Sequence, residues 1–150
     1  MILVGMGLLI ATSYFYSRQN MPDIPPEYQM AGKNEKVIHV NGRVLTVELA
    51  DEPHEQSQGL SNRESLGQEQ GMLFVFQQPL VPSFWMKDMR FALDMLWLDA
   101  SGTIIAITKN ISPTTFPETF QPPSPILYVL EVNSGWSDLN NIKVGDIVSF

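Results

Sequence analysis

The chain contains short apolar runs separated by turn-forming residues, and this arrangement limits the folds open to it. The clearest example is VIHV, then Asn41-Gly42, then RVLTVELA. Asn-Gly supplies the two positive φ angles of a type I′ turn. In the second run Leu45, Val47 and Leu49 recur at every second position, as in a strand with one buried face. We therefore predict a β-hairpin.

Further runs of the same kind follow along the chain and predict more short strands. They are MLFVF after Gly71, FWMK from Phe84 to Lys87, LDMLWLD, TIIAITKN after a turn at 100–102, ILYVLEVN and VGDIVSF. Residues 111–125 hold five prolines, which are excluded from central strands, and predict a long loop. Long loops in compact domains are often functional or mobile.

Two short helices are predicted between these strands. One runs from about Glu52 to Gln58, with Asp51 as its N-cap, Pro53 in its first turn and Gly59 at its end. The other covers one or two turns within residues 134–139. A chain of 150 residues suits one domain. We predict an α+β fold, mostly β, with a curved mixed sheet or pseudo-barrel and two short helices, behind an N-terminal apolar helix.

The N-terminal segment, residues 1–17, is apolar enough to reach a membrane. No charged side chain interrupts Met1 to Tyr16, and Arg18 ends the run. As a helix, Met1 to Tyr16 spans roughly 24 Å, against about 30 Å for a full crossing. It is read as an uncleaved anchor, a cleaved signal peptide or a buried core helix. We favour the anchor, because the run has no polar face and no clear small-x-small cleavage site follows it.

A proline-punctuated linker is expected at 18–35, and the globular domain at 36–150. Arg18, Lys33 and Lys36 all lie downstream of the apolar run. Under the positive-inside rule this asymmetry would leave the domain in the cytoplasm.

Composition argues against several classes of function. Asp and Glu number 16 against 9 for Lys and Arg, a net charge of −7, so nucleic acid is not an expected partner. Without cysteine there are no disulfides, catalytic thiols or thiolate zinc sites. His39 and His54 lack metal-ligand spacing, and no nucleotide-binding glycine motif is present. We expect no metal and no cofactor.

The order VELADEPHEQSQGLSNRESLGQEQGMLFVF, FWMK, LDMLWLDASGTI, YVLEVNSG and IKVGDIV resembles the domain of unknown function family 192 (DUF192) of bacteria and archaea. The resemblance covers about Val44 to Val148. It implies a compact β-rich fold with pseudo-barrel character, and frequent export behind a signal sequence or anchor, but no established reaction. Ser61, Asp88-Met89 and Phe91-Ala92 depart from the family's pattern. Asp88 puts identical ligand specificity in doubt if Lys87 touches a ligand.

The resemblance and the charge count disagree about the side of the membrane. Export places the domain on the outer face of the cytoplasmic membrane, or in the secreted fraction if the segment is cleaved. We follow the resemblance and expect the outer face.

Candidate site residues are charges placed within or between apolar runs. Burying them is costly unless they are paired, so they should pair with one another or line a cleft. A salt-bridged scaffold and a ligand site both satisfy this condition. Trp85 adds an aromatic surface, which its period-two placement makes either part of the core or a ring on which a ligand can stack. The candidates are Glu48, Arg63, Trp85, Lys87, Asp94 and Glu131.

We expect a binding or accessory domain for a small polar ligand, an envelope polymer or a protein partner. Its surface would be a cleft near Arg63, Trp85, Lys87 and Asp94. The alternative is a hydrolase-type enzyme, with Asp94 or Glu131 as general base and Arg63 or Lys87 stabilising negative charge.

Overall fold

A computed structural model describes residues 34–150 of the chain. The anchor expected at 1–17 and almost all of the linker lie outside the described residues. The first strand begins at Glu35, next to the expected domain start. Within residues 34–150 no helix is long and apolar enough to cross a membrane.

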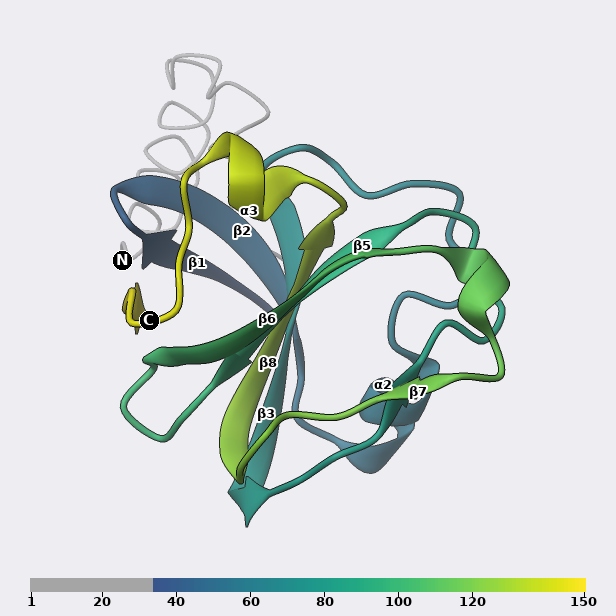
Figure 1. The fold of residues 1–150 in the computed structure, drawn as a ribbon, viewed down its shortest axis with the longest axis horizontal. Coiled ribbons are helices and arrows are strands. Elements are labelled where there is room, and N and C mark those ends of the chain that lie inside the picture. The colour runs from purple at the N-terminus through teal and green to yellow at the C-terminus, as the bar shows by residue number, and fades with distance from the viewer. Residues whose placement is uncertain (1–33) are drawn as a thin grey trace, which may run out of the picture. The chain divides into compact units, whose positions relative to one another are not determined.

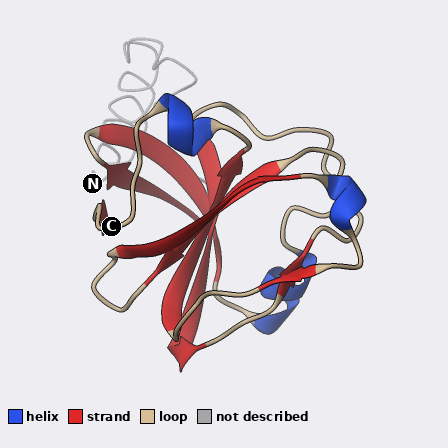
Figure 2. Cartoon of the chain, in the orientation of Figure 1, coloured by secondary structure: helices blue, strands red, loops and turns tan. Residues whose placement is uncertain are grey.

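Residues 34–150 form a mostly β fold that contains two short α-helices (Figures 1 and 2). Seven strands form one sheet in the order β6-β5-β8-β3-β2-β1-β9, and β4 pairs with β7 in a separate two-stranded sheet. The parallel pairing of β2 with β3 makes the large sheet mixed, as predicted. The strands are β1 (Glu35–Val40), β2 (Arg43–Ala50), β3 (Gln70–Leu80), β4 (Phe84–Trp85), β5 (Leu93–Leu98), β6 (Ile104–Ile111), β7 (Thr119–Phe120), β8 (Ile126–Asn133) and β9 (Val148–Ser149).

The large sheet curls strongly into a half-barrel, and the C-terminal segment joins its two edges. β9 pairs with β1. Next to it, Ile147 forms an antiparallel bridge with Thr103 at the start of β6. The Val148 amide donates to the Gly102 carbonyl at 2.9 Å. The C-terminal segment therefore forms a seam between β1 and the beginning of β6.

The predicted hairpin is confirmed. β1 and β2 are antiparallel, and Asn41 and Gly42 have φ angles of 48° and 79°. Leu45 and Val47 are buried, whereas Val44 is exposed. The turn chemistry and the period of two thus set this register, as expected from the sequence.

Two apolar cores lie on opposite faces of the sheet. The first takes residues from all seven strands and so fills the concave side, where Leu130 and Val132 of β8 point. The second contains Val129 of β8 and is covered by β4, β7 and helix α2 (Pro53–Gln58), which lie together beside the sheet in Figure 1. Because β5 is covered on both faces, all six of its residues are buried.

Several predicted boundaries differ in the structure. FWMK forms a strand only at Phe84–Trp85. Its partner, β7, lies in the proline-rich segment predicted as loop, which also contains a 3-10 turn, η2 (Pro113–Thr115). β3 extends beyond MLFVF to Leu80, with an irregular register after Val75. A two-stranded ribbon of two residue pairs can form between prolines because it requires few backbone donors.

The helices lie where the sequence places them, with one correction. The N-cap of α2 is Glu52 rather than Asp51, and Gly59 ends the helix as predicted. The Glu55 carboxylate accepts hydrogen bonds from the amides of both Asp51 and Glu52, so it caps the helix whichever residue begins it. The second helix, α3, covers Trp136–Leu139.

Candidate functional site

A pocket of about 240 Å³ opens on the convex side of the sheet, within the second core. Its walls come from the end of α2 and the following loop, from β3, and from the segment around β4. We call it the Glu131 pocket. It is lined by Gln56, Ser57, Gln58, Gly59, Leu60, Ser61, Phe74, Phe76, Pro82, Ser83, Phe84, Trp85, Met89, Leu93 and Glu131.

Strand register delivers Glu131 to this pocket. Glu131 lies in β8, opposite Met72 of β3 and Met95 of β5. Side chains directly opposite each other in adjacent strands share a face of the sheet. Val129, two residues earlier, belongs to the second core, so Glu131 points into the same core. Its carboxyl group therefore lies between two methionines.

The Glu131 carboxyl is buried without a counter-ion. The residue is 5% exposed. None of the ion pairs formed within residues 34–150 involves it. Burial raises the pKa of Glu131 from its ordinary value of 4.5 to about 8, because the charged form loses its hydration. At neutral pH the empty pocket thus holds a protonated, neutral acid.

Aromatic rings hold the shape of the pocket. Phe84 packs edge-on against Phe74, with ring centroids 4.8 Å apart, and against Trp97, with centroids 5.5 Å apart. The Trp97 indole donates to the Thr108 hydroxyl at 2.9 Å, so this buried polar group is satisfied. Edge-to-face contacts of this kind favour one arrangement of the rings. The pocket is accordingly pre-formed on its aromatic side.

Two loops meet beside the pocket. The Ser61 hydroxyl donates to the Lys87 carbonyl at 2.9 Å, and the Asn62 amide donates to the Asp88 carbonyl at 2.8 Å. Asp88 has a positive φ of 57°, a conformation that Asn and Asp tolerate better than most residues. Ser61 and Asp88 therefore have clear roles in holding the loops together.

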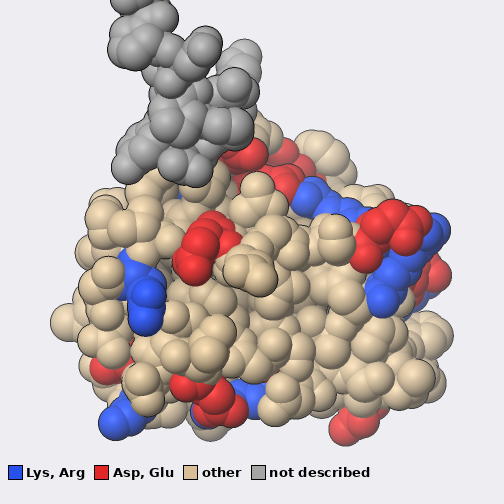
Figure 3. All heavy atoms as spheres, turned by 90° about the horizontal axis from the view of Figure 1, so that it is seen from above, with Lys and Arg blue, Asp and Glu red and all other residues tan. Residues whose placement is uncertain are grey.

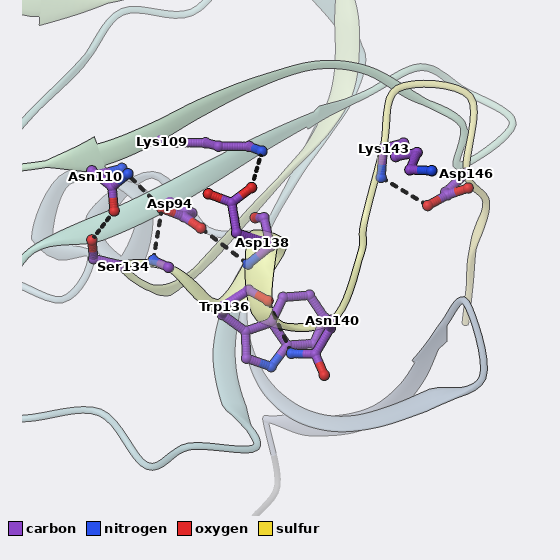
Figure 4. A network of polar contacts seen from close by, with 11 residues as sticks. Asp94, Lys109, Asn110, Ser134, Trp136, Asp138, Asn140, Lys143 and Asp146 are labelled. Atoms are coloured by element: carbon purple, nitrogen blue, oxygen red, sulfur yellow. Dashed lines mark hydrogen bonds and ion pairs between the residues drawn. The ribbon is translucent and has the colours of Figure 1, made fainter.

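Asp94 lies on the other face of the sheet, where its side chain takes part in a network of hydrogen bonds around the start of α3 (Figure 4). It is fully buried. Its carboxylate accepts hydrogen bonds from the backbone amides of Asn110, Gly135 and Ser137 at 2.9, 3.2 and 3.1 Å. These bonds tie the start of α3 to the end of β6. The cleft expected near Arg63, Trp85, Lys87 and Asp94 therefore does not include Asp94, because adjacent residues of a strand point to opposite faces.

Glu48 and Arg63 pair with each other, as expected for charges placed in apolar surroundings. The Arg63 guanidinium contacts both carboxylate oxygens, with Nη2 2.7 Å from Oε2. The hydrogen bond from Arg63 holds the pKa of Glu48 below its usual range, against the opposing effect of burial. Glu48 lies opposite Met72, in the same row across the sheet as Glu131. Arg63 thus compensates one carboxylate of this row and leaves the other alone.

Trp85 and Lys87 lie at the surface. Trp85 is 52% exposed, lines the rim of the pocket and contacts Phe116 of the proline-rich segment. The Lys87 ammonium lies 5.9 Å from the centre of the Trp85 ring. Of the six predicted site residues, the pocket lining includes Trp85 and Glu131. Whether any of the six binds a ligand stays a prediction.

Sequence patterns did not identify most of the pocket wall. For Phe74 and Phe76 they predict only an apolar strand. The signal available was their spacing of two, which places both on one face of β3. That this face also carries Glu131 depends on the pairing of β3 with β8, across more than fifty residues of chain.

The rest of the surface of residues 34–150 has a further hollow and scattered charges. A wider hollow of about 720 Å³ lies between α3 and the loop before β3, with Arg43 and Glu69 at its exposed rim. On the face seen in Figure 3, acidic and basic side chains are scattered over a mostly uncharged surface. Residues 34–150 contain no group of three or more potential metal ligands.

Comparisons with known proteins agree on a family and not on an activity. The family model DUF192, described as an uncharacterised ancient conserved region (ACR), matches residues 36–150. A search of curated proteins finds no significant match. Solved structures do match. A protein of unknown function from Novosphingobium aromaticivorans is 31% identical, with a TM-score of 0.75, over 82% of this chain and 90% of that chain.

A second structure is that of a proposed transcription regulator from Sinorhizobium meliloti. It is 33% identical, with a TM-score of 0.73, over 77% of this chain and 92% of that chain.

Proposed function

The chain belongs to the uncharacterised DUF192 family, and we propose that residues 34–150 form a binding module for a small molecule that occupies the Glu131 pocket. The supporting observation is that the 5% exposed Glu131 has no counter-ion among residues 34–150 and lies at a concave, aromatic-walled site. Ligand sites are typically concave and mostly apolar, with a few polar groups that orient the ligand. Strongly perturbed carboxyls also occur most often at such sites.

Binding has more support than catalysis. A hydrolase-type mechanism needs a group that stabilises the developing negative charge. The described residues that line the pocket include neither Arg63 nor Lys87, nor any other cation. Arg63 is already engaged by Glu48, and Asp94 by three backbone amides. Glu131 can exchange a proton near neutral pH, but the described lining holds no second acid–base group to share the work of a hydrolytic reaction with it.

We extend the proposal to the location of the module. The apolar run from Met1 to Tyr16 would hold the domain at the cytoplasmic membrane, on its outer face, as export in DUF192 proteins implies. A nucleic-acid partner has little support, because a chain with a net charge of −7 is poorly suited to a phosphate backbone.

Closing the pocket tests the binding proposal. Ser83→Trp places a large side chain at the exposed rim, and Ser65→Trp places the same side chain on an exposed loop outside both hollows. We would screen the full chain in lipid nanodiscs, because a detergent tail is itself an apolar ligand. The readout is the melting temperature, which a ligand of the native state must raise.

We expect compounds that stabilise the wild type and Ser65→Trp but not Ser83→Trp. Stabilisation that persists in Ser83→Trp would place the binding site elsewhere, and the proposed pocket would be wrong.

A further inference from the structure

The Glu131 pocket combines features that select the charge of its ligand. Of the residues that line it, from α2 and its loop, β3, β4 and the start of β5, Glu131 alone is ionisable. Its neighbours in the sheet, Met72 and Met95, are uncharged. An anion would meet a carboxyl group with no cation to hold it. A cation would meet the one group able to become its counter-ion.

The aromatic walls favour the same kind of ligand. Phe74, Phe76, Phe84 and Trp85 line the pocket, and the faces of aromatic rings attract cations. Walls of this kind with a carboxylate beside them are suited to an alkylated ammonium group, because its alkyl groups weaken the hydration that the rings must replace.

We propose that the pocket binds a small organic cation, a quaternary or protonated amine, whose charged nitrogen lies against the Glu131 carboxylate and the aromatic rings. This inference rests on the proposed function, and it adds the chemical class of the ligand. The binding step is an exchange: the cation enters, and the Glu131 carboxyl releases its proton to solvent. No bond other than the O–H bond is broken.

The proton exchange has a measurable consequence. With the pKa of Glu131 at about 8, the empty site is largely protonated at pH 7, so a cation that needs the carboxylate must displace close to one proton. Affinity should therefore rise about tenfold between pH 6 and pH 7, and level off above pH 8. A neutral ligand should show neither effect.

Matched probes test the charge directly. Choline and 3,3-dimethyl-1-butanol have nearly the same shape and differ in the central atom, a cationic nitrogen or a neutral carbon. Benzyltrimethylammonium serves as a larger cation. All three would be titrated calorimetrically into the full chain in nanodiscs, in buffers of different ionisation enthalpy, which reports the number of protons released.

We expect at least one cation to bind at least about tenfold more tightly than the alcohol at pH 7.5, with release of close to one proton at pH 7. In Glu131→Gln the pH dependence should disappear, and the preference should shrink to what the aromatic rings alone provide. Glu48→Gln removes a carboxylate from the same row outside the pocket and should leave both unchanged. The proton count comes from the wild type alone, so it remains decisive even if Glu131→Gln folds poorly.

The outcomes separate this inference from the proposed function. If the alcohol binds as well as the cations, or if no proton is released, the cation assignment is wrong while the pocket still binds ligands. If neither cation binds, the assignment is also wrong. The small-molecule function itself is then judged by the Ser83→Trp screen.

Discussion

At Glu131, strand register places a carboxyl between Met72 and Met95, and no cation is supplied to it by residues 34–150. At Glu48, in the same row, Arg63 supplies one. The two carboxylates differ in their partners, because the loop that carries Arg63 reaches Glu48 and not Glu131. Their pKa values accordingly move in opposite directions, above 4.5 for Glu131 and below 4.5 for Glu48.

Glu131→Gln should change how stability depends on pH. In the unfolded chain the carboxyl ionises near 4.5, and in the folded protein near 8. Between these values the folded state holds a proton that the unfolded state has lost, so wild-type stability falls as pH rises and levels off above 8. Relative to Glu131→Gln, the wild type should lose about 2.5 kcal/mol between pH 5 and pH 7.

Denaturant unfolding at several pH values measures this difference. Glu48→Gln is the control with the opposite sign: the lowered pKa of Glu48 contributes stability above about 4.5 that disappears as pH falls. Parallel stability curves for the wild type and Glu131→Gln would show that Glu131 is not a buried neutral acid.

Asp94→Asn should destabilise the fold without affecting the pocket. The Asp94 carboxylate accepts three backbone hydrogen bonds, and an amide nitrogen in place of one oxygen faces a donor with another donor. We expect a loss of about 2–4 kcal/mol in the free energy of unfolding. Ligand binding by the folded fraction should be unchanged, because Asp94 lies on the concave face. A loss of affinity in folded Asp94→Asn would contradict this separation.

At the scale of elements, the seam depends on close approach between the C-terminal segment and the turn before β6. A Cβ on Gly102 would lie 2.5 Å from the Val148 carbonyl oxygen, and Gly102 has a φ of +81°. Gly42 in the first hairpin has nearly the same φ, +79°, but a Cβ there would have no neighbouring atom within 4 Å. Substitutions at the two glycines therefore distinguish two costs: the strain of a positive φ, which both share, and the steric clash with the Val148 carbonyl, which only Gly102 has.

Gly102→Ala should therefore cost more than Gly42→Ala. Gly42→Ala should lower the free energy of unfolding by about 1 kcal/mol, the strain of a positive φ. Gly102→Ala should lower it by about 1–3 kcal/mol more, because the seam must open. Denaturant unfolding gives both values. Faster amide hydrogen exchange at Val148 in Gly102→Ala alone would identify the seam as the part released. Equal losses would mean that the seam adds little stability.

At the scale of the described domain, the concave side of the half-barrel is filled mainly by side chains of its own strands. The convex side is covered by α2 and the β4–β7 ribbon (Figures 1 and 2). This second layer is what makes a pocket possible. A sheet with only a filled interior would leave Glu131 on a wet outer face, where its carboxylate would need no partner. The pocket therefore belongs to the packing of two layers rather than to any one element.

The location of the whole chain is tested by fractionation. We expect the full chain to remain in the membrane fraction after alkaline extraction, and added protease to degrade the domain in spheroplasts without lysis. Deletion of residues 1–17 should release it, because we propose that the apolar run supplies the attachment. Protection of the domain until lysis would place it on the inner face, as the charge count alone suggests.

Local patterns in the sequence determined most of the strands, the hairpin turn and both short helices, but not β7. A period of two, an Asn-Gly pair and a glycine after a helix act over a few residues, so they can be read without the rest of the fold. They also indicated a curved mixed sheet. They were less reliable at boundaries such as Phe84–Trp85, where the partner strand lies in a proline-rich segment.

The tertiary structure alone decided how the charged residues are grouped. The sequence singled out Glu48, Arg63, Asp94 and Glu131 but could not say which share a face. That depends on register between strands distant in the chain, and a shift of one residue reverses every side chain. Pairing of β8 with β3 and β5 sends Glu131 to the convex face and Asp94 to the concave one. One carboxyl thereby becomes a structural acceptor, and the other the polar group of a pocket.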